Sequence, residues 1–410
     1  MYYFYWLPVG TDARVRGVPW ITWLILVADV AVFAALQALP GAEAFAYRLA
    51  FKAGQPTVAT AISSLFLHAS PTQLLLNVAL LACLGPALET RLGRAGFLVG
   101  FLACGWASNL ARAAWISMLA PDMGTLPIMG AAGAVSGLMG LFLVRLSFAH
   151  LRFASLRLLL TQGILRSGRR TIPVVVAISL WFALQVVIGL REPVPEAALA
   201  GHLGALLVGL GFGLGMGMAP QGRIESFRAA GDRYAARGEW FAALGEYDAY
   251  LAAVPDDPEA LVQTARVERV MHQEALAAGH FQAAVRIWLQ RNRLREACDA
   301  FDEMKRLLGE VTLPPGDLLR VARAFEVLDR PGGASRAYEE FGRLYPDRDS
   351  AAVAILKSAE LEAGALNNPA RARYLYEELL GRSLTPEIER VVRERAGERK
   401  APAAPEETLA

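Results

Sequence analysis

The first half of this chain contains apolar segments long enough to cross a lipid bilayer, and they constrain the fold more than any other feature. A helix of roughly 18 or more apolar residues spans the hydrocarbon core of a membrane. We predict six spans, at residues 20–39, 73–88, 95–114, 128–146, 172–190 and 197–219. We therefore expect an all-α fold with a six-helix transmembrane bundle in this half.

The second half has a different character. After about Pro220 the sequence becomes charged and amphipathic. We divide the chain into an N-terminal interfacial segment (1–19), a six-span membrane domain (20–220), a soluble cytoplasmic α-helical repeat domain (221–400) and a disordered tail (401–410). The N-terminal segment is aromatic at Tyr2–Trp6 and is followed by arginines, which is typical of the membrane surface and not of a cleaved signal peptide.

Arginine placement predicts how the spans are oriented. The connections on one side carry Arg14, Arg16, Arg91, Arg94, Arg152, Arg157, Arg166, Arg169 and Arg170. The opposite connections carry Asp122, Glu192 and Glu196, with Arg48 and Lys52 as exceptions. The positive-inside rule then places both termini in the cytoplasm. The arginine, alanine, glycine and leucine richness indicates a bacterial protein, and hence the inner membrane.

Composition also bears on partners and cofactors. The formal charge of the 410 residues is only +2, and no basic stripe with interleaved aromatics is present, so we expect no nucleic acid. The three cysteines have no pairing or metal-ligand spacing. We find no acidic or histidine cluster for a metal site, and we expect neither a metal nor an organic cofactor.

A recurrent cassette follows Pro220. Gly238-Glu239-Trp240 precedes Ala243, Tyr247 and Pro255, and Gly279-His280-Phe281 precedes Ala284. Looser versions join Asp329 to Ala334, Tyr338 and Pro346, and Asn367 to Ala372 and Tyr376. The pattern resembles tetratricopeptide repeats, whose stacked helix pairs form a concave groove for a soluble protein or peptide. A generic bundle of helical hairpins is the alternative.

Polar residues inside the predicted spans are candidate site residues, because polar groups in a membrane are costly. Gln73 and Asn77 fall on one helix face, and both can donate hydrogen bonds as an oxyanion site requires. Alone, each is more typical of an interhelical hydrogen bond. Gly130 and Gly133 indicate tight backbone geometry, and glycines recur through the fourth and sixth spans in a pattern that brings helices close together.

Taken together, these residues resemble the rhomboid family of intramembrane serine proteases. The matching stretches cover about half the chain: Ser64–Ser70 leading to Asn77, Glu89–Gly93, Gly130–Gly137, and His202–Ala205 leading to Gly209. In that family a serine in the fourth span attacks the peptide carbonyl and a histidine in the sixth span is the general base. Residues of the second span help to hold the oxyanion.

Carried over by position, the resemblance places the nucleophile at Ala132 and the base at His202. The oxyanion histidine falls on Gln73, while His68 and Asn77 match the family pattern. A methyl group cannot attack a carbonyl, so Ala132 removes the reacting atom. Ser136 lies one turn beyond Ala132 on the same face, about 5–6 Å deeper, and we interpret it as a packing residue.

Three functions remain open from the sequence. The first is a rhomboid-like pseudoprotease that binds transmembrane segments of client proteins in the lipid bilayer and recruits a soluble partner through its repeats. The second is an active intramembrane serine endopeptidase, either through another nucleophile or as a Ser→Ala inactivated form. The third is a repeat adaptor for which the membrane half is only an anchor.

Overall fold

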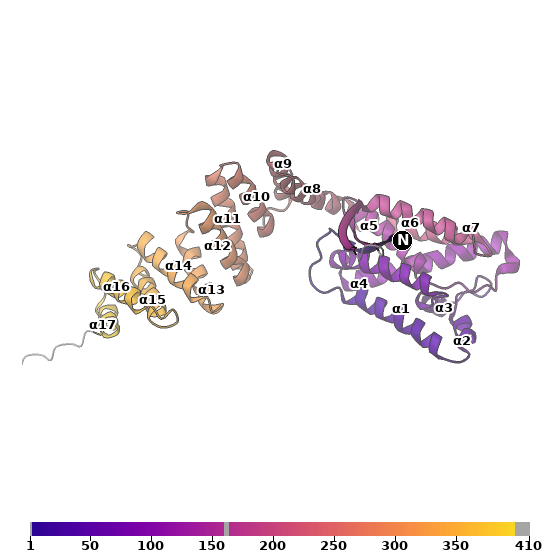
Figure 1. Ribbon diagram of the computed structural model, residues 1–410, viewed down its shortest axis with the longest axis horizontal. Helices are drawn as coiled ribbons and strands as arrows, with labels where there is room; N and C mark the ends of the chain where they lie inside the picture. Colours follow the sequence, from indigo (N-terminus) through magenta and orange to yellow (C-terminus); the bar gives the residue numbers. More distant parts are fainter. Residues whose placement is uncertain (1, 160–163, 398–410) are drawn as a thin grey trace, which may run out of the picture. The chain divides into compact units, whose positions relative to one another are not determined.

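The computed structural model describes residues 2–159 and 164–397, and its fold is helical, as the sequence predicts (Figure 1). The chain divides into two compact units, Met1–Ala229 and Ala230–Ala410. The division falls nine residues beyond the expected boundary at 220, inside helix α8 (Met218–Ala236). The expected disordered tail, 401–410, lies outside the described residues.

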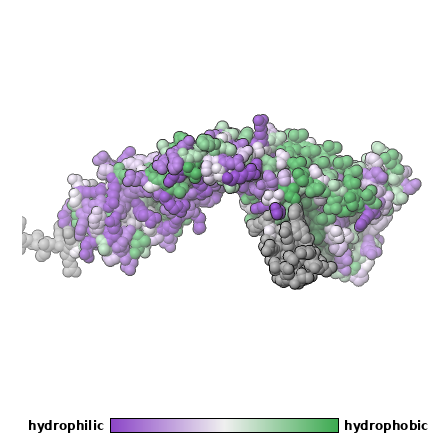
Figure 2. Space-filling view, turned by 45° about the horizontal axis from the view of Figure 1, so that its top comes forward, coloured by the Kyte–Doolittle hydropathy of each residue, from purple (hydrophilic) through white to green (hydrophobic). Residues whose placement is uncertain are grey.

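The first unit is built from apolar helices. Its elements are α1 (Trp20–Ala38), α2 (Ala42–Leu49), α3 (Val58–Ser63), η1 (Ser64–Phe66), α4 (Pro71–Leu119), η2 (Pro121–Met123), α5 (Ala132–Leu146), α6 (Val174–Gly189), α7 (Pro195–Gly215) and the start of α8. Among the described residues, α1, α4 and α7 are long and apolar enough to cross a membrane, and α5 and α6 are shorter apolar helices. Figure 2 shows hydrophobic surface over this unit, as lipid contact requires.

Helix α4 contains both the second and the third predicted spans. It runs for 49 residues, but Gly93 has φ 72° and ψ 168°, a conformation outside any helix. The chain therefore forms two helical segments that meet at Gly93. Only glycine adopts such a positive φ at little cost. Gly93 lies between the second and third predicted spans.

The start of α1 is capped by a distant carboxylate. Pro19 precedes the helix and offers no capping side chain. Glu89 of α4 instead accepts hydrogen bonds from the backbone nitrogens of Ile21 and Thr22, at 3.0 and 2.8 Å, and from the Thr22 hydroxyl at 2.8 Å. A buried anion at a helix N-terminus pairs with the free amide groups and with the helix dipole. Glu89 thereby fixes α1 against α4.

A three-stranded antiparallel sheet is the feature that the sequence analysis missed. Strand β1 (Tyr2–Thr11) pairs with β2 (His150–Leu159), which pairs with β3 (Ile164–Pro173). From the sequence we expected an interfacial segment and an arginine-rich loop here. Strands of this kind favour aromatic and β-branched residues, but two of them pair across almost 140 residues of sequence. The side chains of Arg157, Arg166 and Arg169 lie outside the described part of the structure.

Glu225 ties the beginning of α8 to the membrane helices. Its carboxylate lies 2.7 Å from a guanidinium nitrogen of Arg91 in α4 and 2.7 Å from one of Arg145 in α5. Both arginine side chains are nearly buried, at 10% and 7% exposure. The helix also approaches α5 closely, because a Cβ at Gly222 would lie 2.6 Å from the Arg145 carbonyl oxygen. The first turns of α8 therefore belong to the first unit.

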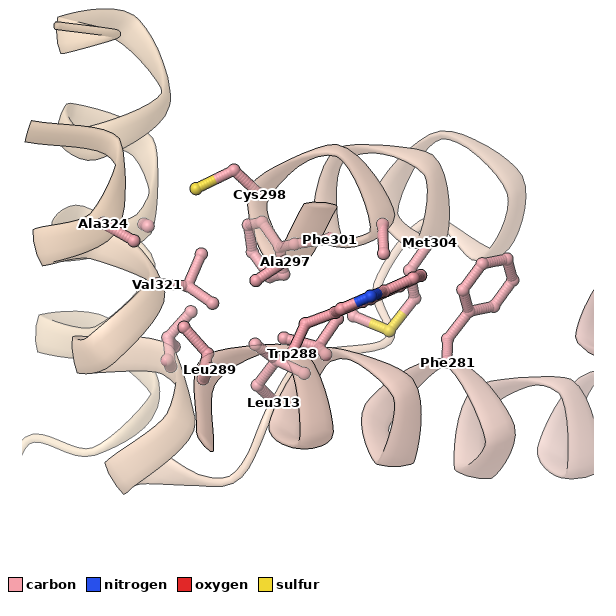
Figure 3. Close-up of a cluster of buried hydrophobic side chains, with 14 of the residues drawn as sticks. Phe281, Trp288, Leu289, Ala297, Cys298, Phe301, Met304, Leu313, Val321 and Ala324 are labelled. Carbon is pink, nitrogen blue, oxygen red and sulfur yellow. The ribbon is translucent and has the colours of Figure 1, made fainter. Parts of the chain in front are cut away.

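The second unit is a succession of helices in which sequence neighbours pack together. They are α9 (Trp240–Ala253), α10 (Pro258–Val270), α11 (Glu274–Gln290), α12 (Leu294–Leu308), α13 (Pro315–Val327), α14 (Pro331–Leu344), α15 (Ala351–Ala363), α16 (Pro369–Leu380) and α17 (Pro386–Arg395). Figure 3 shows part of the core, where Phe281 and Trp288 of α11 lie beside Phe301 and Met304 of α12.

A turn with positive φ recurs through this unit and sets the register of the repeat. Five of the residues in this conformation open a cassette: Gly238, His272, Asn292, Asp329 and Asn367. Five positions after each of them stands a buried alanine, and nine positions after each stands a buried aromatic residue: Ala243, Ala277, Ala297, Ala334 and Ala372, then Tyr247, Phe281, Phe301, Tyr338 and Tyr376. Each cassette thus places a small and a large residue on one face of a helix.

Two details of the predicted cassettes were wrong. Gly279, His280 and Phe281 lie inside α11, so they do not form the turn that opens a cassette. The turn is at His272, seven residues earlier, and it leads to Ala277 and Phe281. A further cassette, Asn292 with Ala297 and Phe301, was missed.

Candidate functional site

The loop before α4 and the loop before α5 meet at Gln73. Ser70 caps α4, and its hydroxyl accepts a hydrogen bond from the Gln73 backbone nitrogen at 3.2 Å. The Gln73 side chain accepts from the Ala69 nitrogen at 2.8 Å and donates to the Met129 carbonyl at 3.1 Å. The amide that the resemblance assigns to the oxyanion site is therefore bound to the backbone of the facing loop.

Gly130 is needed at this junction for two reasons. Its φ is +118°, and a Cβ there would lie 2.5 Å from Nε2 of Gln73. Its backbone nitrogen donates to the Ser64 carbonyl at 2.9 Å. A side chain at this position would both strain the backbone and displace Gln73. The structure thus brings Gly130 and Gln73 together.

His68 and Asn77 are buried with unused hydrogen-bonding groups. His68 is 5% exposed, and neither of its ring nitrogens has a hydrogen-bond partner among the described residues. Asn77 is 2% exposed, and its Nδ2 also lacks a partner there. Buried donors without partners are uncommon in proteins and call for an explanation such as a bound group. Both residues keep the capacity to hydrogen-bond a ligand.

Ala132 is the first residue of α5 and is partly exposed, whereas most of the helix behind it is buried. Its methyl group occupies the position that the resemblance assigns to the nucleophile. Its carbonyl oxygen accepts a hydrogen bond from the Ser136 hydroxyl at 2.7 Å. The site therefore has access at position 132 but no reactive atom there.

His202 in α7 is held from two sides. Its Nδ1 lies 2.9 Å from Oγ of Ser136, and its ring packs perpendicular to that of Trp181 of α6, with centroids 5.4 Å apart at 87°. The imidazole is 9% exposed and Ser136 is fully buried. When the Ser136 hydroxyl donates to Ala132, the imidazole donates from Nδ1 and leaves Nε2 as the acceptor, which is the form a general base needs.

Close helix contacts position these side chains. A Cβ at Gly209 in α7 would overlap the carbonyl oxygen of Gly137 in α5, and a Cβ at Gly133 would overlap the Ser108 hydroxyl in α4. Small residues let apolar helices approach in this way. The expected packing role of these glycines is confirmed, and it brings α5 against both α4 and α7.

The Ser136–His202 contact and the position of Trp181 beside His202 were not predicted from the sequence. Ser136 had a detectable signal, because it lies four residues after Ala132 and so shares its helix face. Trp181 had none, since a tryptophan in an apolar span is ordinary. Within residues 2–159 and 164–397 no group of three histidine, cysteine or acidic residues is placed to hold a metal ion.

Comparison with known proteins gives one clear result. No curated protein matches the chain. A solved structure described as "Crystal structure of MamA protein" is 15% identical and covers 40% of this chain and 98% of that chain, but its TM-score of 0.21 supports no conclusion about fold. Residues 55–219 match the family described as "Rhomboid domain", which confirms the resemblance for the membrane half. This integral membrane protein therefore carries a rhomboid domain at residues 55–219.

Proposed function

We propose that the protein is a rhomboid-like pseudoprotease that binds transmembrane segments of client proteins without cutting them. The observation that carries this proposal is Ala132, a partly exposed methyl group at the start of α5, where the attacking hydroxyl would stand. Nucleophilic attack on a peptide carbonyl needs a hydroxyl, thiol or similar group. Nε2 of His202 can act as the proton acceptor, but Ala132 has no hydroxyl proton for it to remove.

Ser136 does not replace the missing nucleophile. Four residues along a helix correspond to about 6 Å, so its hydroxyl lies one turn below the exposed start of α5. It is fully buried and bonded to both Ala132 and His202. A substrate carbonyl that approached position 132 would be too far away, and displacement by even about 1 Å reduces rates by about 100-fold.

The retained polar residues support client binding. His68 and Asn77 keep unpaired donors in a buried environment, and an unpaired polar group in lipid is costly. The carbonyl or hydroxyl of a client helix with a loosened backbone would satisfy them. A role in binding gives these residues a function that does not require a nucleophile at position 132.

The arrangement in the membrane and the role of the second unit belong to the same proposal. The chain crosses a bacterial inner membrane six times, with α4 contributing two spans that meet at Gly93 and both termini in the cytoplasm. Arg14, Arg91 and Arg145 lie at one end of the bundle, where Arg91 contacts both the Arg14 carbonyl and Glu225, as the positive-inside rule favours. The turn, alanine and aromatic pattern favours tetratricopeptide-like repeats, which would recruit a soluble protein or peptide.

The test separates binding from cleavage. The protein is reconstituted in liposomes with single-span reporters that carry a fluorophore at each end, so that energy transfer reports binding and fragment size reports cleavage. We expect binding without cleavage by this chain and by His202→Ala. Turnover by Ala132→Ser, abolished by adding His202→Ala, would show an intact but disarmed site. Absence of reporter binding by correctly folded protein would reject the proposal.

An active endopeptidase is the second candidate, because Ser136 and His202 form a hydroxyl–imidazole pair at 2.9 Å. This candidate requires α5 to move so that the buried hydroxyl becomes accessible. It predicts reporter cleavage by the present chain and loss of that cleavage in Ser136→Ala. Cleavage that survives Ser136→Ala would exclude Ser136 as the nucleophile.

A further inference from the structure

Arg112 places a charged side chain at the end of the bundle where α5 begins. It follows Arg91 in α4 by 21 positions, which corresponds to roughly 30 Å of helix, as much as the hydrocarbon core is thick. Arg91 and Arg145 share Glu225 and therefore mark one end of the bundle. Because Arg145 closes α5, the first residue of that helix, Ala132, lies at the Arg112 end.

The aliphatic part of the Arg112 side chain packs beside the candidate site. A Cβ at Gly201 would lie 2.6 Å from Cγ of Arg112 and 2.9 Å from Oγ of Ser108. Gly201 directly precedes His202 in α7. A Cβ at Gly133, in the first turn of α5, would overlap the same serine hydroxyl. Arg112 therefore lies next to the backbone that carries the histidine and one turn from the contact with α5.

The guanidinium group of Arg112 is only partly used. Its Nη2 donates to Oε2 of Glu192 at 2.6 Å, whereas its Nε is buried and has no hydrogen-bond partner among the described residues. A carboxylate that binds a guanidinium side-on accepts from both of these nitrogens, and such paired bonds are the strong ones. A buried donor without a partner costs free energy. The geometry therefore leaves room for a better carboxylate ligand than Glu192.

Glu192 is a ligand that can be displaced. It belongs to the short connection between α6 and α7, where its backbone nitrogen donates to the Gly189 carbonyl at 2.8 Å. Its side chain is 38% exposed, and that of Arg112 is 19% exposed. An ion pair with an exposed partner contributes little to stability. Another carboxylate can replace Glu192 at low cost and without unfolding a helix.

We propose that Arg112 binds an acidic side chain of the client at the non-cytoplasmic end of its transmembrane segment, and that Glu192 holds the guanidinium while the site is empty. This inference rests on the proposed function and specifies which clients the site accepts. In the orientation proposed above, arginines are less frequent at this end. A charged residue in an apolar helix marks a functional site more often than a packing position.

The position of Arg112 limits where the client carboxylate stands. Arg112 follows Ser108 by one helical turn, about 6 Å along the axis. An extended chain covers this distance in about two residues. The acidic residue of the client therefore lies within a few residues of the backbone that faces Ala132.

The experiment compares two single-span reporters that differ by one charge. One carries aspartate and the other asparagine, placed in turn at each of the last three positions at the non-cytoplasmic end of the span. Each is titrated against the full chain in liposomes, and energy transfer gives the Kd. We expect aspartate at one of these positions to tighten binding by about 10-fold over asparagine.

Substitutions of Arg112 test whether this residue causes the difference. In Arg112→Gln the two reporters should bind alike, and the asparagine reporter, which offers no carboxylate, shows that the variant is folded. Arg112→Lys keeps the charge but not the two parallel hydrogen bonds, so it should keep only part of the difference. Glu192→Gln removes the competing carboxylate and should tighten binding of the aspartate reporter by a further factor of about 3.

The matched control is Arg48→Gln, which removes a positive charge from an exposed position of α2 on the same expected side of the membrane. It should keep the full difference between the reporters. Equal affinities for the unsubstituted chain, or a difference that survives Arg112→Gln, would overturn this inference and leave the proposed function standing. Binding of neither reporter by folded protein would reject the proposed function and this inference with it.

Discussion

The Ser136 hydroxyl lies 2.9 Å from Nδ1 of His202, so the imidazole is held by a serine that is itself inaccessible to substrate. In serine hydrolases the group that contacts Nδ1 orients the base and leaves Nε2 free. Ser136 occupies that orienting place here. The histidine is held in a working position although the residue that it would activate, at position 132, is alanine.

This arrangement predicts that Ser136 is a positioning residue in the Ala132→Ser variant, in which the nucleophile is restored. In an Ala132→Ser background, Ser136→Ala should lower the cleavage rate by about 10- to 100-fold, because the imidazole loses its fixed orientation. Ser136→Thr keeps the hydroxyl and should restore most of the activity. Ser179→Ala, which removes a serine hydroxyl bonded to the Val175 carbonyl at 3.0 Å on the exposed side of α6, should have no effect. Equal activity of Ser136→Ala and its parent would refute the positioning role.

The Glu89 cap predicts a specific loss of stability. Glu89→Gln removes the charge and one acceptor oxygen from a site with three hydrogen bonds. We expect a loss of about 2 kcal/mol in the free energy of unfolding, measured by denaturant titration in detergent. Glu196→Gln, at the exposed first turn of α7, should change the stability by less than about 0.5 kcal/mol. Similar effects of the two substitutions would contradict the capping role.

Two glycines of α7 offer a matched pair. A Cβ at Gly209 would overlap the Gly137 carbonyl, whereas a Cβ at Gly211 would meet nothing within 4 Å. Gly209→Ala should therefore cost about 3 kcal/mol by forcing α5 and α7 apart. Gly211→Ala should leave stability unchanged or raise it by up to about 1 kcal/mol, since alanine favours helix more than glycine does. Thermal unfolding of both variants measures these changes in stability. The prediction fails if Gly209→Ala is as stable as the unsubstituted protein.

His280 predicts a pH dependence in the second unit. A hydrogen bond to the buried Glu268 carboxylate, at 2.8 Å, raises the pKa of the imidazole above its usual value. A raised pKa means that this pair stabilises the fold fully below the unfolded-state value, near 6.5, and that the stabilisation is lost as pH rises through the higher folded-state value. Hydrogen exchange of α10 and α11 in the full chain should therefore show protection that declines with pH. In His280→Gln, which cannot ionise, the opening free energy should not vary over this range.

The repeated turns show where sequence reasoning succeeds and where it fails. The first cassette was recognisable because Gly238 permits a positive φ without strain. His272, Asn292 and Asp329 adopt the same conformation with side chains that only tolerate it. The cassette at Asp329 was still recognisable from Ala334 and Tyr338, whereas those at His272 and Asn292 were not.

The candidate site was predictable in its residues but not in its contacts. The spacing of His68, Gln73, Asn77, Ala132 and His202 could be read from the chain, and all five positions lie within the rhomboid match at residues 55–219. The use of Gln73 to tie two loops depends on the fold of Met129 and Gly130, which lie 56 or more residues away. The sheet was missed for the same reason, because pairing of β1 with β2 is a long-range property.

Glu225 shows that a domain boundary placed by hydropathy separates residues that interact with each other. Apolar sequence ends near 220, yet the carboxylate of Glu225 that pairs with both Arg91 and Arg145 comes after that point. A proteolytic cut or a gene fusion at residue 220 would leave two nearly buried guanidinium groups without their counter-ion at the end of the bundle. Any recombination that transplants this membrane half must therefore carry part of α8 with it.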